Sequence, residues 1–77
     1  MTVGKTATDL EAMIMGRLRE NRACAGLARV QVVPEGDEGG WRVHAQPRMG
    51  MTVLDECMRA ISAIVNDLRR EYRLAEK

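Results

Sequence analysis

The sequence has very few aromatic residues, with no phenylalanine, one tryptophan and one tyrosine among 77 residues. Proteins that bind single-stranded nucleic acid by base stacking present several aromatic side chains on one surface. This scarcity argues against that class of binding. It also leaves Trp41 as the main aromatic anchor that we expect in the core.

Histidine and cysteine, which supply many catalytic and metal sites, are almost missing. His44 is the only histidine, so one chain cannot assemble a histidine-based metal cluster or catalytic triad. Cys24 and Cys57 are far apart in the sequence and lack the C-x-x-C spacing. We expect two reduced thiols, with Cys57 packed in the core and Cys24 more accessible, and a disulfide between them as the open alternative. We therefore expect no cofactor, no metal and no catalytic activity.

Long apolar runs and a strong net charge are also absent. No run of roughly 18 or more apolar residues occurs, which predicts that no segment spans a membrane. Residues 1–8 lack the apolar core of an export signal. Twelve basic and eleven acidic residues leave a net charge of +1, which gives little attraction to nucleic acid or anionic membranes. Together with reduced cysteines, these features predict a cytoplasmic protein.

The first helix is expected over residues 9–22, after a flexible arm formed by residues 1–7. Thr8 and Glu11 have the spacing of a capping box, and Gly26 is the expected terminator. Four apolar residues recur at helical spacing and form one stripe: Leu10, Met13, Ile14 and Leu18.

Two strands are predicted from apolar–polar alternation over residues 28–33 and 41–46, and a proline ends each run. The connection over residues 35–40 is rich in glycine and acid, which favours an antiparallel hairpin. Valine, tryptophan and alanine side chains, Ala28 included, should face inward. The outward side chains form a possible polar contact face: Arg29, Gln31, Arg42, His44 and Gln46.

The second helix begins after Thr52 and carries the longest apolar stripe in the sequence. A helix of about 20 residues spans ~30 Å, whereas strands of six or seven residues span ~20 Å. Part of the stripe should therefore overhang the sheet and serve as an interface. The candidate interface residues are Leu54, Met58, Ile61, Val65, Leu68 and Tyr72. Residues 75–77 are expected to fray.

The predicted fold is α+β, an αββα arrangement in which two helices pack on a two-stranded hairpin within a single domain, residues 1–77. A lone two-stranded hairpin is marginal in water, and a chain of this length buries a small core. We therefore expect a homodimer. Its copies would join their hairpins into a four-stranded sheet or pack their long helices together, with exchange of a helix as a variant.

The function predicted from these features is a homodimeric interaction or binding module with an unidentified protein partner. The alternative is a nucleic-acid-binding protein, because ten of the twelve basic residues are arginines, whose planar forks hold phosphates well. Balanced charge and missing aromatic residues favour the first function over the second.

The run Gly39-Gly40-Trp41-Arg42-Val43 is followed by a set of positions in the second helix: Cys57, Ala60-Ile61, Ile64-Val65, Leu68-Arg69 and Tyr72. This pattern resembles a group of short, uncharacterised alphaproteobacterial proteins with helix–strand–strand–helix order. The similarity covers most of the chain and rests on packing residues. It implies a bacterial cytoplasmic protein and brings no activity, cofactor or site residue.

Overall fold

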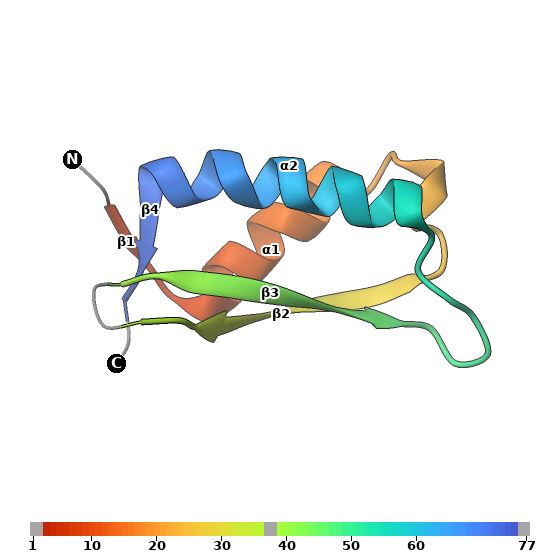
Figure 1. Ribbon diagram of the computed structural model, residues 1–77, viewed down its shortest axis with the longest axis horizontal. Helices are drawn as coiled ribbons and strands as arrows, with labels where there is room; N and C mark the ends of the chain where they lie inside the picture. Colours follow the sequence, from red (N-terminus) through yellow and green to blue (C-terminus); the bar gives the residue numbers. More distant parts are fainter. Residues whose placement is uncertain (1–2, 37–38, 76–77) are drawn as a thin grey trace.

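The computed structural model describes residues 3–36 and 39–75. The elements are β1 (Val3–Lys5), α1 (Ala7–Leu18), the 3₁₀ turn η1 (Arg22–Cys24), β2 (Leu27–Pro34), β3 (Trp41–Pro47), α2 (Asp55–Glu71) and β4 (Tyr72–Leu74). The predicted α+β class and the helix–strand–strand–helix order are confirmed, with two short terminal strands added (Figure 1). Expectations for Met1, Thr2, Asp37, Glu38, Glu76 and Lys77 lie outside the described residues.

Strands β2 and β3 pair antiparallel, with Val32 opposite Val43. The inward alternation holds for Val30 and Val32, which are buried. It fails at Ala28, which is exposed, because the register shifts between Leu27 and Arg29. This irregularity turns Leu27 into the core in place of Ala28.

Helix α1 starts and ends earlier than the capping-box pattern predicts. The hydroxyl of Thr6, rather than that of Thr8, accepts from the Asp9 amide at 3.1 Å. At the other end the helix stops at Leu18, and the Asn21 side chain accepts from the Ala23 amide to begin η1. A short polar side chain that bonds its neighbouring backbone competes with helix continuation.

The expected flexible arm is ordered from Val3 onward. Strand β1 pairs parallel with β4, so that Val3 lies opposite Tyr72 and Lys5 lies opposite Leu74. The Ala75 amide extends this pairing by donating to the Lys5 carbonyl at 2.8 Å. Helix α2 therefore ends at Glu71, and Tyr72 belongs to a strand instead of the helical stripe.

Strand β4 also contacts the end of the hairpin. The Leu74 amide donates to the Gly39 carbonyl at 2.8 Å, and the Trp41 indole Nε1–H donates to the Tyr72 carbonyl at 3.3 Å. Gly39 has φ +80°, and a Cβ placed there would lie 2.8 Å from Arg73 Cβ. The connection can approach β4 this closely because it has glycine at this position.

One apolar core lies between the hairpin and the helices. In Figure 1, α2 runs along the length of the hairpin and α1 crosses behind it at a steep angle. Trp41 is almost fully buried, as expected of the main aromatic anchor. The other fully buried side chains come from α1, β2 and α2: Leu10, Ile14, Val30, Cys57 and Leu68.

The two cysteines form a disulfide, which corrects the favoured expectation of free thiols and confirms the alternative left open. Cys24 in η1 is bonded to Cys57 in the first turns of α2, with 5.0 Å between the Cα atoms. Both residues are buried in the core. The bond closes a segment with a sequence separation of 33 and fixes η1 against α2.

Among residues 3–36 and 39–75, no helix is both long enough and apolar enough to cross a membrane.

Candidate interaction surface

Helix α2 turns half of the six predicted interface residues toward the chain's own core. Ile61, Val65 and Leu68 are buried there, and only Ile61 and Val65 also reach the groove described below. The hairpin covers this helical face together with α1 and η1. The expected overhang is therefore restricted to the N-terminal end of α2, where Leu54 and Met58 are exposed.

These two residues belong to a larger exposed apolar surface, here named the methionine patch: Met49, Met51, Leu54 and Met58. Met49 is 100% exposed, in the connection between β3 and α2 that projects from one end of the molecule (Figure 1). Methionine side chains are flexible and polarisable, so they adapt to partner surfaces of different shapes. The sequence signal for this patch was the pair of methionines that flank Gly50.

The two edges of the hairpin differ in how they are covered. On the β2 edge, the Glu11 carboxylate of α1 accepts from the Val32 amide at 2.8 Å. In an antiparallel pair, opposite residues either exchange backbone hydrogen bonds or both point their backbone groups away from each other. Since the Val32 amide points outward to Glu11, its partner Val43 directs its own backbone N–H and C=O to the outer edge of β3. Ala45, two residues further along β3, also directs its backbone groups to this outer edge. No strand within residues 3–36 and 39–75 pairs with that edge.

A groove of about 170 Å³ separates the free edge of β3 from α2. The strand contributes Arg42 and Val43. The helix contributes Met58, Ile61, Ser62, Val65, Asn66 and Arg69. Met58 is shared with the methionine patch, so the groove and the patch form one continuous surface.

The exposed flank of α2 beside this groove has opposite charges at its two ends. Asp55 lies in the first turn and Arg69 in the last, equally far along the sequence from Ser62. At 3.6 residues per turn, all three lie on one face of the helix. Arg69 Nη2 lies 3.7 Å from Glu35 Oε1, and this ion pair is about half exposed on both sides. Exposed pairs of this kind contribute little to stability, which leaves Arg69 able to contact another carboxylate.

The five residues of the predicted polar contact face lie together on the outer side of the hairpin. Gln31 is opposite His44, and Arg29 is opposite Gln46. The Gln46 amide donates to the Gln31 side-chain oxygen at 3.1 Å, and Arg29 Nη2 lies 4.0 Å from Glu11 Oε1. Arg42 and His44 are exposed, and no ion pair involves them among the described residues. The five side chains are polar, and the two arginines among them lie on different strands.

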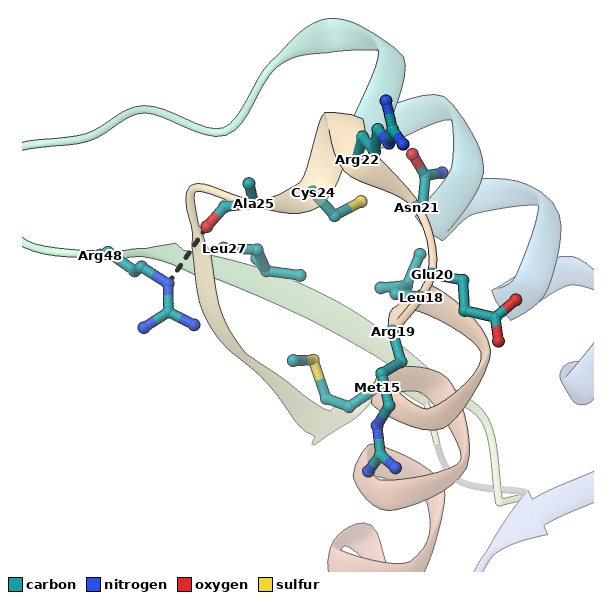
Figure 2. A pocket seen from close by; sticks show the side chains of 10 residues that line it. All are labelled: Met15, Leu18, Arg19, Glu20, Asn21, Arg22, Cys24, Ala25, Leu27 and Arg48. Atoms are coloured by element: carbon teal, nitrogen blue, oxygen red, sulfur yellow. Dashed lines mark hydrogen bonds between the residues drawn. The ribbon is translucent and has the colours of Figure 1, made fainter.

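A second hollow lies at the opposite end of α1 from β1 and was not foreseen from the sequence. It measures about 360 Å³ and is bounded by the end of α1, η1, the start of β2 and Arg48 (Figure 2). All its lining residues except Arg48 come from residues 15–27, and the hollow forms because this stretch folds from α1 through η1 into β2. Within the described residues, no group of three or more His, Cys, Asp or Glu side chains could hold a metal ion.

Comparison with protein-family models, curated proteins and solved structures finds no match for this chain. The resemblance to short alphaproteobacterial proteins stays a prediction.

Proposed function

We propose that this protein is a homodimeric protein-interaction module whose two copies meet through the free edge of β3 and the exposed flank of α2. One observation carries the proposal: a strand edge unpaired among the described residues lies directly beside a helix flank with an acid at one end and a base at the other. When two copies are related by a two-fold axis, their strand edges can pair with each other, and the acid of each helix faces the base of the other.

Pairing of the two β3 strands joins the hairpins into a four-stranded sheet. With His44 on the axis, Val43 of one copy lies opposite Ala45 of the other, and their outward backbone groups exchange hydrogen bonds. Arg42 then lies opposite Gln46, so no like charges face each other in the register. The β2 edge is less suited to this pairing because α1 already occupies it through Glu11.

The same axis brings the two α2 helices side by side in antiparallel orientation. Asp55 of each copy then meets Arg69 of the other, and the small Ser62 side chain lies where the helices are closest. His44 is the middle residue of β3, and Ser62 is next to the middle residue of α2. Because α2 runs along the hairpin (Figure 1), one axis can pass through both centres.

The dimer covers Met58, which lines the groove, and leaves the other residues of the methionine patch outside the strand pairing on each copy. We assign this patch to a protein partner with an apolar binding surface, because adaptable methionine side chains suit such contacts. Two copies of the patch on one dimer would also allow bivalent binding.

Nucleic acid is the competing ligand, and the polar face is the feature that favours it. A continuous four-stranded sheet would bring the Arg29 and Arg42 side chains of both copies to one surface. Binding of this type falls steeply with added salt. We expect no salt-dependent binding of duplex or single-stranded oligonucleotides, since each copy supplies only two arginines to this face.

The disulfide bears on the compartment in which the protein works. Disulfides persist in oxidising compartments and are rare in the cytoplasm. We propose that the Cys24–Cys57 bond is formed in the working protein, which favours an oxidising compartment over the cytoplasm expected from reduced cysteines. Alkylation of intact cells before lysis tests this, because a formed disulfide protects both cysteines from the reagent.

Light scattering after size-exclusion chromatography tests the dimer through a pair of matched variants. Wild-type protein should have twice the 8.6 kDa mass of one chain. Ser62→Arg places two cations and two large side chains on the axis and should give the mass of one chain. Ala63→Arg adds the same side chain at the next exposed position, turned about 100° around the helix, and should remain dimeric. A monomeric wild type, or equal behaviour of the two variants, would contradict the proposal.

A further inference from the structure

The hollow at the end of α1 has an apolar floor beneath a basic rim. Its floor is made by Met15, Leu18, Cys24 and Leu27, three of which are buried. Two arginines, Arg19 and Arg48, line its edge, and Arg22 and Glu20 line it as well with their charged groups turned away. The volume of about 360 Å³ lies within the range of small-molecule sites, roughly 300–1,000 Å³.

Arg48 is held in place while most of its donors stay available. Its backbone amide donates to the Gly26 carbonyl at 2.8 Å, and its Nε–H donates to the Ala25 carbonyl at 3.1 Å. Within the described residues, neither of its Nη groups has a hydrogen-bond or ion-pair partner. A guanidinium held through Nε loses less conformational freedom when its outer edge binds an anion.

Arg19 supplies a second cation from a different element. Figure 2 shows the two guanidinium groups at different edges of the hollow, that of Arg48 beside Ala25 and Leu27 and that of Arg19 below Met15, whereas Glu20 and Arg22 point away from it. Arg19 also has no ion-pair partner among the described residues. The hollow therefore combines one anchored and available cation, Arg48, with a floor of methionine, leucine and disulfide atoms.

We propose that this hollow binds a small aliphatic carboxylate. The carboxylate accepts from the Nη groups of Arg48, and the aliphatic chain covers Leu27 and Met15. Planar guanidinium and carboxylate groups match in a two-point hydrogen-bonded pair. The ligand's chain removes apolar surface from water, which a simple anion such as chloride or acetate does not do.

This site is independent of the proposed dimer. The hollow and the groove beside β3 share no residue. Loss of dimerisation in Ser62→Arg should therefore leave ligand binding at the hollow unchanged. An experiment can contradict the proposed dimer without contradicting the proposed carboxylate site, and the reverse also holds.

Titrations followed by ¹H–¹⁵N NMR test the site with octanoate as the probe. We expect saturable shifts at the amides that surround the hollow. Octylamine, which has the same chain and the opposite charge, should produce none there. Acetate should bind at least about tenfold more weakly than octanoate, because it lacks the apolar body.

Arg48→Gln should weaken octanoate binding by about tenfold or more, as expected for loss of a charged hydrogen-bonding partner. Arg59→Gln is the matched control, because Arg59 is an exposed arginine of α2 that does not line the hollow. The NMR spectrum of each variant reports whether it is folded. Absence of saturable shifts with octanoate would overturn the proposal, as would equal binding of octylamine or equal affinities of the two variants.

Discussion

At the scale of single residues, Glu11 links the first helix to the sheet. Its Oε2 accepts from the Val32 amide at 2.8 Å, and its Oε1 lies 4.0 Å from Arg29 Nη2. The sequence pattern assigned this carboxylate to a capping box with Thr8. Threonine at position 6 or 8 can cap a helix, and in the structure Thr6 does so. The Glu11 carboxylate is therefore free to bind the Val32 amide, 21 residues away in the sequence. Local spacing contains no information about such a contact.

Removal of the Glu11 carboxylate should destabilise the protein. Glu11→Ala leaves a partly buried Val32 amide without an acceptor, at a cost of about 1–3 kcal/mol in the free energy of unfolding. Glu11→Gln keeps an acceptor and should cost less. Urea unfolding measures both, with Glu20→Ala, an exposed position, as the control. Equal stability of Glu11→Ala and Glu20→Ala would show that the Glu11 contact contributes nothing.

Trp41 joins the core to the C-terminal strand. The ring is 1% exposed, and its Nε1–H donates to the Tyr72 carbonyl at 3.3 Å. Trp41→Ala should cost about 3–5 kcal/mol, a large share of the stability of a domain this small. Trp41→Phe keeps an aromatic ring and loses the hydrogen bond, so thermal unfolding should place it between Trp41→Ala and the wild type. A Phe variant as unstable as the Ala variant would contradict the assigned packing role.

At the scale of elements, the sequence predicted the parts that depend on periodicity. The spacing of Ile61, Val65 and Leu68 located α2 and its apolar face, and alternation located β2 and β3. The same spacing could not show which surface this face covers, because a helical stripe looks the same against its own chain and against a partner. In the structure these three residues are buried in the core, and their predicted role in an interface stays a prediction.

The short terminal strands escaped prediction, and the disulfide stayed an open alternative, for a different physical reason. β1 and β4 have three residues each, too few to show alternation, and they exist because their chain ends pair with each other. Cys24 and Cys57 meet because η1 interrupts the chain after α1 and turns Cys24 toward α2. Both features depend on tertiary contacts between distant segments.

The disulfide should contribute substantially to stability. Closure of a segment with a sequence separation of 33 predicts a loss of about 3–4 kcal/mol when both cysteines are replaced by serine. Guanidinium unfolding of the Cys24→Ser/Cys57→Ser variant measures this loss. Reduction of the wild type with dithiothreitol is the companion measurement and should shift the unfolding midpoint in the same direction. An unchanged midpoint under both treatments would exclude a structural role for the bond.

At the scale of the whole molecule, the arrangement of charge on α2 leads to a proposal that composition alone could not make. The net charge of +1 does not show how the charges are arranged. On α2, Asp55 and Arg69 lie symmetrically about Ser62, beside a strand edge with which no other described strand pairs. When two α2 helices associate in antiparallel orientation, Asp55 of each copy meets Arg69 of the other, which gives two intermolecular ion pairs. The register of the dimer can therefore be tested through charge alone.

Mixing of two charge-reversed variants tests the dimer most directly. Asp55→Arg sets an arginine against Arg69 of a second copy, and Arg69→Asp sets an aspartate against Asp55 of a second copy, so each variant alone should be largely monomeric by light scattering. An equimolar mixture restores opposite charges at both contacts and should give a heterodimer of about twice 8.6 kDa. Thermal unfolding checks that each variant remains folded. Dimers formed by either variant alone, or a mixture that stays monomeric, would contradict the proposed two-fold arrangement.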